Sequence, residues 1–141
     1  MARIQGSLAH VSTEFEVYEP DTYTMQIKKV EVKTKDDENG GKDTRVQYII
    51  TLEFADGEYK GRKLMDFIEY HKKDGEINPI GQIQLKRYFE AVVGEERANE
   101  DDLDTDELLD GDVLVELKIS SYTKDGKEKK NNKITSVSPL G

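Results

Sequence analysis

The sequence predicts a mainly β fold, a five-stranded barrel with one helix between the third and fourth strands. Three features of the chain point to this class. Apolar side chains alternate with polar ones over five short segments, which is the period of a half-buried strand. Glycine-containing turns separate most of these segments. A single helical pattern interrupts them in the middle of the chain.

The first strand is expected at residues 22–34, after an irregular lead-in over residues 1–21. Its apolar residues change phase half-way, from Tyr23, Met25 and Ile27 to Val30 and Val32. One extra residue in a strand re-aims the side chains that follow it, so the change of phase predicts a β-bulge at Lys28 and Lys29. A long first strand that bends in the middle is typical of small coiled barrels.

The second strand, residues 44–54, alternates most regularly, and Tyr48 and Phe54 lie on its apolar side. The turn at Asp56-Gly57 then leads into a third strand near residues 62–68.

A helix is predicted from Pro79 to a stop at Gly94, with Asn78 as its N-cap. Helical spacing marks the apolar positions Ile80, Ile83, Tyr88, Phe89 and Val92 as the side that packs.

The remaining segments complete the predicted barrel. A short helix can form in the acidic connection of residues 95–112, where Asp104 or Thr105 can cap it. A fourth strand at residues 112–120 turns through Asp125-Gly126 into a fifth at residues 133–137. This order of strands and helix is the OB-fold arrangement. Residues 1–141 are therefore expected to form one OB-fold-like domain.

The formal net charge of −9 is not spread evenly over the chain. Residues 95–112 hold ten acids against one base, Arg97, and carry the whole excess. Residues 118–133 hold six lysines against Asp125 and Glu128. Since local potential decides where a polyanion can bind, the net charge does not exclude nucleic acid.

Several classes of protein are disfavoured by composition. The chain has no cysteine, and no apolar run approaches the roughly 20 residues of a membrane helix. The first residues lack the apolar stretch of a secretory signal. His10 and His71 lie far apart without a clear nucleophile or ligand set. We therefore expect a binding protein of the cytoplasm, neither secreted nor bound to a membrane, with no catalytic residues, metal or cofactor.

The chain resembles a bacteriophage family that was long catalogued as a domain of unknown function and is associated with binding of single-stranded DNA. The resemblance rests on five stretches in the expected order, YEPDTYTMQI, GEYKGRKL, IGQIQLKRYFEAVVG, TDELLDGDVLVELKI and NNKITSVSP. It implies an OB-like protein that protects or presents single-stranded DNA during phage replication or recombination, in the cytoplasm of the bacterial host.

OB folds bind oligonucleotides on strands two and three and on the two loops beside them. Binding without sequence preference combines a basic groove with aromatic faces on which bases stack. These rules select ten candidate residues: Arg45, Gln47, Tyr59, Lys60, Arg62, Lys63, Phe67, Tyr70, Tyr122 and Lys124. On a regular third strand, Arg62 faces one side while Tyr59, Lys63 and Phe67 face the other, and the sequence leaves both sides open.

The acidic segment, Glu95 to Asp112, has two interpretations. It is either a solvated connection or a surface that recruits replication or recombination proteins. A rival function from another class follows from the second interpretation, a protein-binding module or DNA mimic that inhibits a host enzyme through this acidic face. The sequence gives no indication of oligomeric state.

Overall fold

The computed structural model describes residues 17–34, 45–72 and 74–140 of the chain. In chain order its elements are β1 (Asp21–Thr34), β2 (Val46–Phe54), β3 (Lys63–His71), α1 (Pro79–Val93), α2 (Glu95–Ala98), the 3-10 helix η1 (Thr105–Leu108), β4 (Asp112–Lys124) and β5 (Lys127–Pro139). The strands form one antiparallel sheet in the order β3-β2-β1-β4-β5. The prediction of a mainly β fold with a helix after the third strand is confirmed.

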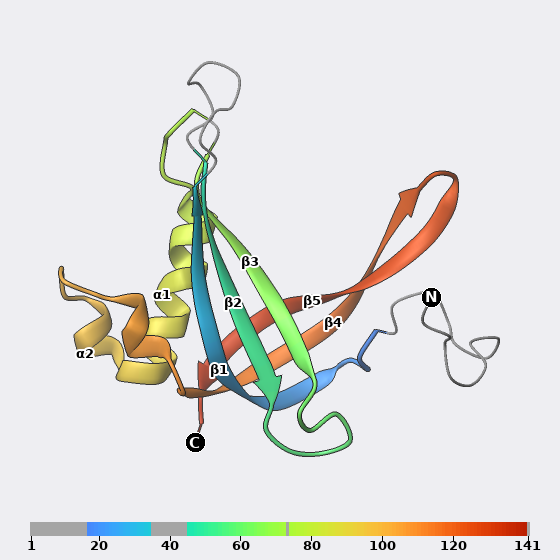
Figure 1. Cartoon of the computed structure of the whole chain (residues 1–141), viewed down its shortest axis with the longest axis horizontal. Helices are drawn as coiled ribbons and strands as arrows, with labels where there is room; N and C mark the ends of the chain where they lie inside the picture. Colours follow the sequence, from blue (N-terminus) through green and yellow to red (C-terminus); the bar gives the residue numbers. More distant parts are fainter. Residues whose placement is uncertain (1–16, 35–44, 73, 141) are drawn as a thin grey trace, which may run out of the picture.

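Strand β1 is long enough to serve both halves of the sheet. Its first residues pair with β4, and its later residues pair with β2. The register with β2 shifts between Ile27 and Lys29, which confirms the predicted bulge. Figure 1 shows the result, in which β1 bends between the β2–β3 side and the β4–β5 side. The bend sets the two halves of the sheet at a large angle to one another.

The core lies on the inner side of this bent sheet and is closed by α1. The largest fully buried side chains come from every strand except β5, from α1 and from η1. They are Met25, Ile27, Ile50, Leu52, Phe54, Ile68, Tyr88, Leu108, Val113, Val115 and Leu117. The prediction that Phe54, Tyr88 and Phe89 belong to the core is confirmed. Each buried side chain of this size contributes roughly 1.5–3 kcal/mol relative to its exposed form.

Helix α1 begins as its sequence predicts. The Asn78 side chain accepts hydrogen bonds from the backbone N–H groups of Ile80 and Gly81, at 3.1 and 3.4 Å, and Pro79 occupies the first turn. Gly94 ends the helix with a φ of 89°, which favours glycine. However, Ile80 and Ile83 are 68% and 52% exposed, so their predicted place in the packed side is wrong. The side of α1 that packs carries Gly81, Tyr88 and Phe89, and Ile80 and Ile83 point away from it.

The two outer strands, β3 and β5, do not pair with one another, so the sheet is not closed. Side chains link these strands instead. Helix α1 packs against both, and its Tyr88 hydroxyl donates to Asp66 Oδ2 of β3 at 2.6 Å. The lead-in provides a second link, because the Tyr18 hydroxyl donates to the Lys63 carbonyl and the Tyr18 backbone exchanges two hydrogen bonds with the Asn132 side chain.

Three strands differ in length from their predictions. Strand β3 continues to His71, β4 continues to Lys124, and β5 already begins at Lys127. The predicted short helix is present as η1, capped by Asp104, while the single turn α2 was not predicted. Of the predicted lead-in, residues 17–20 are irregular and residues 1–16 lie outside the described part of the chain.

Replacing Tyr88 with phenylalanine should destabilise the protein by about 1–3 kcal/mol at pH 7. The change removes the donor to Asp66, a carboxyl whose pKa burial raises and the Tyr88 hydrogen bond lowers. Without that bond the pKa of Asp66 rises further, so the destabilisation should shrink as the pH falls and Asp66 becomes protonated. Urea unfolding at pH 7 and at about pH 4 measures the difference. If the variant lost the same free energy of unfolding at both pH values, Asp66 would not be ionised at this contact.

Candidate nucleic-acid interface

The β4–β5 hairpin extends beyond the rest of the sheet. Strand β1 pairs with β4 only as far as Leu117, and from Lys118 onward β4 pairs with β5 alone. Residues 118–133 therefore form a two-stranded ribbon, called the basic ribbon below, which projects from the body in Figure 1. Asp125 and Gly126 close it with φ values of 55° and 76°, as a two-residue hairpin turn requires.

The register of the basic ribbon places nearly all of its charge on one side. Residues directly opposite one another share a face, and successive residues alternate. One face, called the lysine face below, consists of Lys118, Ser120, Tyr122, Lys124, Lys127, Lys129, Asn131 and Lys133. The other face consists of Ile119, Ser121, Thr123, Glu128, Lys130 and Asn132. The lysine face thus has five lysines, an exposed tyrosine and no acid.

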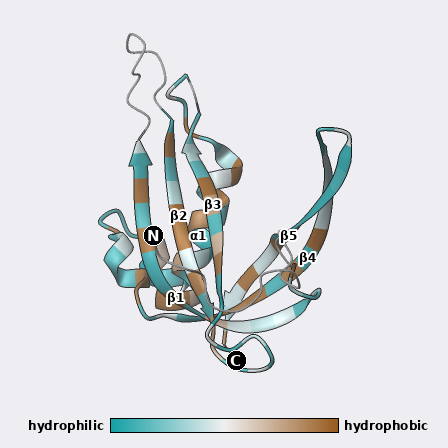
Figure 2. Ribbon diagram, turned by 45° about the vertical axis from the view of Figure 1, so that its right-hand side comes forward, coloured by the Kyte–Doolittle hydropathy of each residue, from teal (hydrophilic) through white to brown (hydrophobic). Residues whose placement is uncertain are grey.

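The lysine face is the outer side of the hairpin. Asn132, on the opposite face, bonds to the Tyr18 backbone, and Ile119 beside it is partly buried. Figure 2 shows that the projecting end of the hairpin is hydrophilic, in contrast to the part of the sheet that meets the core. No described element covers the lysine face, on which Lys118, Lys124, Lys127 and Lys133 are exposed and Lys129 is partly buried.

This arrangement costs stability when the protein is alone. Lys118 pairs directly with Lys133, and Lys124 pairs directly with Lys127. Like charges in directly opposite positions destabilise a sheet, and a two-stranded ribbon is marginal in water even without them. A polyanion laid along the face would relieve this repulsion.

A second exposed surface lies on the outer side of β2 and β3. Met65 and Phe67 point outward and are 52% and 56% exposed. They lie opposite Thr51 and Ile49 of β2, which are nearly buried. Lys63 shares this side, since it is two and four residues before Met65 and Phe67. The surface offers an aromatic ring and a flexible thioether on the outer side of the sheet.

The charge on this outer side is mixed. Lys28 and Lys29 of β1 form ion pairs with Glu53 and Glu31, at 3.3 and 3.0 Å. Lys63 lies opposite Glu53. Strands β2 and β3 therefore supply the exposed aromatic ring, and the unbalanced positive charge is on the basic ribbon.

The ten residues selected from the sequence lie in several places. Gln47, Lys63 and Phe67 are on the outer side of β2 and β3, and Tyr122 and Lys124 are on the lysine face. Lys60 and Arg62 belong to the turn between β2 and β3, and Arg45 immediately precedes β2.

Two of the selected tyrosines are largely occupied by packing. Tyr59 joins an aromatic cluster with Tyr18, Tyr23 and Phe54, at ring-centroid distances of 4.8, 5.8 and 5.4 Å. The Arg62 guanidinium lies over its ring at 5.9 Å. Tyr70 turns to the inner side, against Tyr48 at 5.6 Å. Of the two alternatives for the third strand, Lys63 and Phe67 share its outer side, without Tyr59.

The ten candidates selected from the sequence do not include Met65 or four of the five lysines of the lysine face. Met65 carries neither a charge nor an aromatic ring, so the sequence does not mark it as a contact for nucleic acid. The lysines do carry a signal. A two-residue turn at Asp125-Gly126 fixes the pairing of every residue before it with one after it, and that pairing places alternate lysines on one face.

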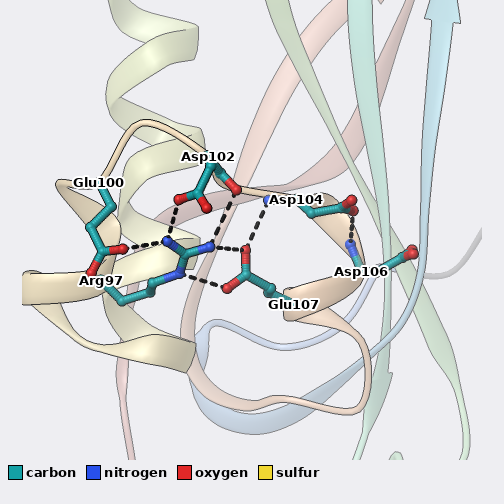
Figure 3. A network of polar contacts seen from close by, with 6 residues as sticks. All are labelled: Arg97, Glu100, Asp102, Asp104, Asp106 and Glu107. Atoms are coloured by element: carbon teal, nitrogen blue, oxygen red, sulfur yellow. Dashed lines mark hydrogen bonds and ion pairs between the residues drawn. The ribbon is translucent and has the colours of Figure 1, made fainter.

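The acidic connection lies at the other end of β4 and is organised by Arg97 (Figure 3). Its Nε and Nη2 bond to both carboxylate oxygens of Glu107, at 2.7 and 3.0 Å, and its Nη1 bonds to Glu100 and Asp102, each at 2.6 Å. The hydrogen bonds from Arg97 hold the pKa of Glu107 and of Asp102 below the usual range. Glu107 also accepts from the Asp104 backbone, which completes a capping box on η1. The connection is thereby held in one shape.

Two further features were sought in residues 17–34, 45–72 and 74–140, a metal site and a membrane-spanning helix. Within these ranges no three His, Asp or Glu side chains are grouped so that they could hold a metal ion. No helix in them is both long and apolar enough to cross a membrane.

The comparisons with known proteins give one match, to a protein family. Residues 6–140 match a family model described as "Protein of unknown function (DUF669)". No curated protein matches the chain. Because the match covers nearly the whole sequence, the chain belongs to this family of unknown function.

Proposed function

We propose that this protein binds single-stranded DNA with little sequence preference and protects it, or presents it to enzymes of phage replication or recombination in the host cytoplasm. The observation that carries the proposal is the lysine face, where five lysines and Tyr122 lie together without an acid. The resemblance of the sequence to a phage family associated with single-stranded DNA adds the biological setting.

Two features favour single strands over duplex. Non-specific single-strand binders combine a basic track for the phosphates with aromatic rings for the bases. Tyr122, 46% exposed, stands on the basic ribbon, and Phe67 stands on the outer side of β3. Since base faces are covered by stacking in a duplex, these rings can contact bases only where the strand is single.

The fold supports the same proposal. We interpret the sheet as an OB fold whose barrel is open between β3 and β5, because OB folds are five-stranded, partly open barrels. The number of strands and the place of α1 in the chain fit this interpretation. OB folds bind oligonucleotides with strands two and three and with the loop between strands four and five. Phe67 and the basic ribbon occupy these two positions.

The mechanism has two parts. Lys127 and Lys129 lie two residues apart on the same strand of the lysine face and are separated by about 7 Å, which lets their ammonium groups follow successive phosphates of an extended strand. The counterions released from the phosphates supply most of the affinity. Stacking on Phe67 and Tyr122 adds roughly 1–3 kcal/mol per base without reading its identity.

A fluorescence anisotropy titration with labelled oligonucleotides tests the proposal. We expect tighter binding to single-stranded than to duplex DNA, little difference between single strands of unrelated sequence, and affinity that falls steeply with salt. Equal binding to single strand and duplex at low salt, or none to either, would overturn the proposed function.

Replacing Phe67 with alanine should weaken binding of a single strand by about 1–3 kcal/mol, or roughly 5- to 150-fold. The ring is exposed, so stability should change by less than about 0.5 kcal/mol. Anisotropy titration and thermal unfolding measure the two effects. Ile80→Ala is the matched control, because Ile80 is equally apolar and exposed but lies on α1. Equal affinities for the two variants would show that Phe67 does not stack on bases.

A further inference from the structure

The acidic connection and the tip of the basic ribbon lie at opposite ends of β4. The acidic connection leads into β4 at Asp112, and the tip of the basic ribbon follows β4 at Lys124. Thirteen extended residues span about 40 Å. Figure 1 shows α2 at one side of the molecule and the tip of the hairpin at the far side. The acidic connection therefore cannot reach the tip of the basic ribbon of its own chain.

The acidic connection keeps a large unneutralised charge. Arg97 engages only Glu100, Asp102 and Glu107. Seven further acids are exposed: Glu95, Glu96, Asp101, Asp104, Asp106, Asp110 and Asp112. None of the seven forms an ion pair within the described part of the chain. Because Arg97 fixes the backbone that carries them, little conformational entropy would be lost when a partner binds.

The lysine face is the complementary surface on the same chain. It is an outer sheet face that no described element covers, and its opposed lysines repel one another. Single exposed ion pairs contribute only about 0–1 kcal/mol, so contact requires several at once. Five lysines at fixed spacing and seven fixed acids satisfy that requirement.

We propose that the lysine face of one copy of this chain binds the acidic connection of a second copy. The two surfaces differ, so the contact is heterologous, and it leaves a free lysine face at one end of the pair and a free acidic connection at the other. Such contacts continue head to tail into open chains. The contact goes beyond the proposed function and does not require it, and DNA bound along the lysine face would compete with it.

Sedimentation velocity on the full chain tests the contact. At about 20 mM salt, we expect the mean mass to rise with protein concentration, and at about 300 mM salt we expect a monomer, because exposed charges are then screened. A wild-type chain that stays monomeric at low salt overturns the proposal.

Two variants test which surfaces meet. The first, Lys124→Gln with Lys127→Gln and Lys129→Gln, loses lysines and keeps the acids. The second, Glu95→Gln with Glu96→Gln and Asp101→Asn, loses acids outside the Arg97 network and keeps the lysines. Each should be monomeric alone at low salt, and an equimolar mixture should form a 1:1 complex that grows no further. Self-association of either variant alone, or a mixture that remains monomeric, overturns the proposal.

DNA titration separates this inference from the proposed function. The acid variant retains the lysine face, so it should bind a single-stranded oligonucleotide at least as tightly as the wild type while it fails to self-associate. Binding of DNA by a wild type that remains monomeric would overturn the contact and leave the proposed function in place. A wild type that self-associates but does not bind DNA would overturn the proposed function and leave the contact in place.

Discussion

Replacing Lys124, Lys127 and Lys129 together with glutamine should weaken binding of a single-stranded oligonucleotide about 100-fold at 0.1 M salt. All three lysines lie on the lysine face, two of them opposite one another beside the turn. Each phosphate contact contributes about 0.7 to the slope of log affinity against log salt, so the slope should fall by about 2. Anisotropy titrations of the wild type and the variant at four salt concentrations give both quantities.

A second triple variant controls for the change in net charge. Lys72, Lys86 and Lys130 are also exposed, but they lie after β3, on α1 and on the opposite face of the ribbon. Their replacement by glutamine should change the slope by less than half as much. Equal slopes for the two triple variants would show that net charge, and not the lysine face, governs binding.

Replacing Gly81 with alanine should destabilise the protein by about 3 kcal/mol, the upper end of what forced overpacking usually costs. Gly81 lies in the first turn of α1, directly over β3. A Cβ atom there would lie 1.8 Å from the Glu69 carbonyl oxygen and 2.8 Å from its carbon. Alanine favours a helix over glycine by only about 1 kcal/mol, so the clash decides the sign. Urea unfolding measures the change.

Gln82→Ala is the control for this position. Gln82 is the next residue of α1 and is exposed, so its replacement should change the free energy of unfolding by less than about 0.5 kcal/mol. If Gly81→Ala were as stable as the wild type, α1 could not pack against the β3 backbone as closely as described. An unstable Gly81→Ala protein should also lose the link from Tyr88 to Asp66, since both depend on the position of α1.

Most of the fold could be predicted because each element carries its own local signal. The phase change at Lys28 and Lys29 predicted the bulge, and Asn78 and Gly94 marked the ends of α1. The predictions missed the ends of strands whose side chains do not pack in the core. Beyond Leu117 the hairpin no longer contributes to the core, so apolar alternation ends although hydrogen bonding continues to Lys124.

Tertiary packing explains the remaining differences. Ile80 and Ile83 have the spacing of a buried helix face, but spacing does not specify whether another element covers that face. The link between the two unpaired outer strands likewise depends on the place of α1, which contacts both β3 and β5. The residue patterns of β3 and β5 do not predict their contacts with α1.

The sequence predicted the kinds of residue in the candidate site better than it predicted where they lie. The turn from Gly57 to Arg62 carries Tyr59 back onto Tyr18 and Phe54, so a residue selected as a stacking platform became part of a cluster. Phe67 and Lys63 fulfil the expectation that they share the outer side of β3. The lysines of the lysine face come together only when β4 pairs with β5. The residue pattern of either strand alone does not show that these lysines share a face.

The two-residue turn at the tip of the basic ribbon restricts how the ribbon can change in length. Adding one residue to each strand between the Lys118–Lys133 pair and the rest of the ribbon would rotate all later side chains to the opposite face. Lys124, Lys127 and Lys129 would then leave the face of Lys118 and Lys133. Adding two to each strand would keep every lysine in place and move the tip outward by about 7 Å. Insertions in this hairpin should therefore be tolerated in pairs, and a relative with a longer ribbon would cover more of a bound strand in steps of that size.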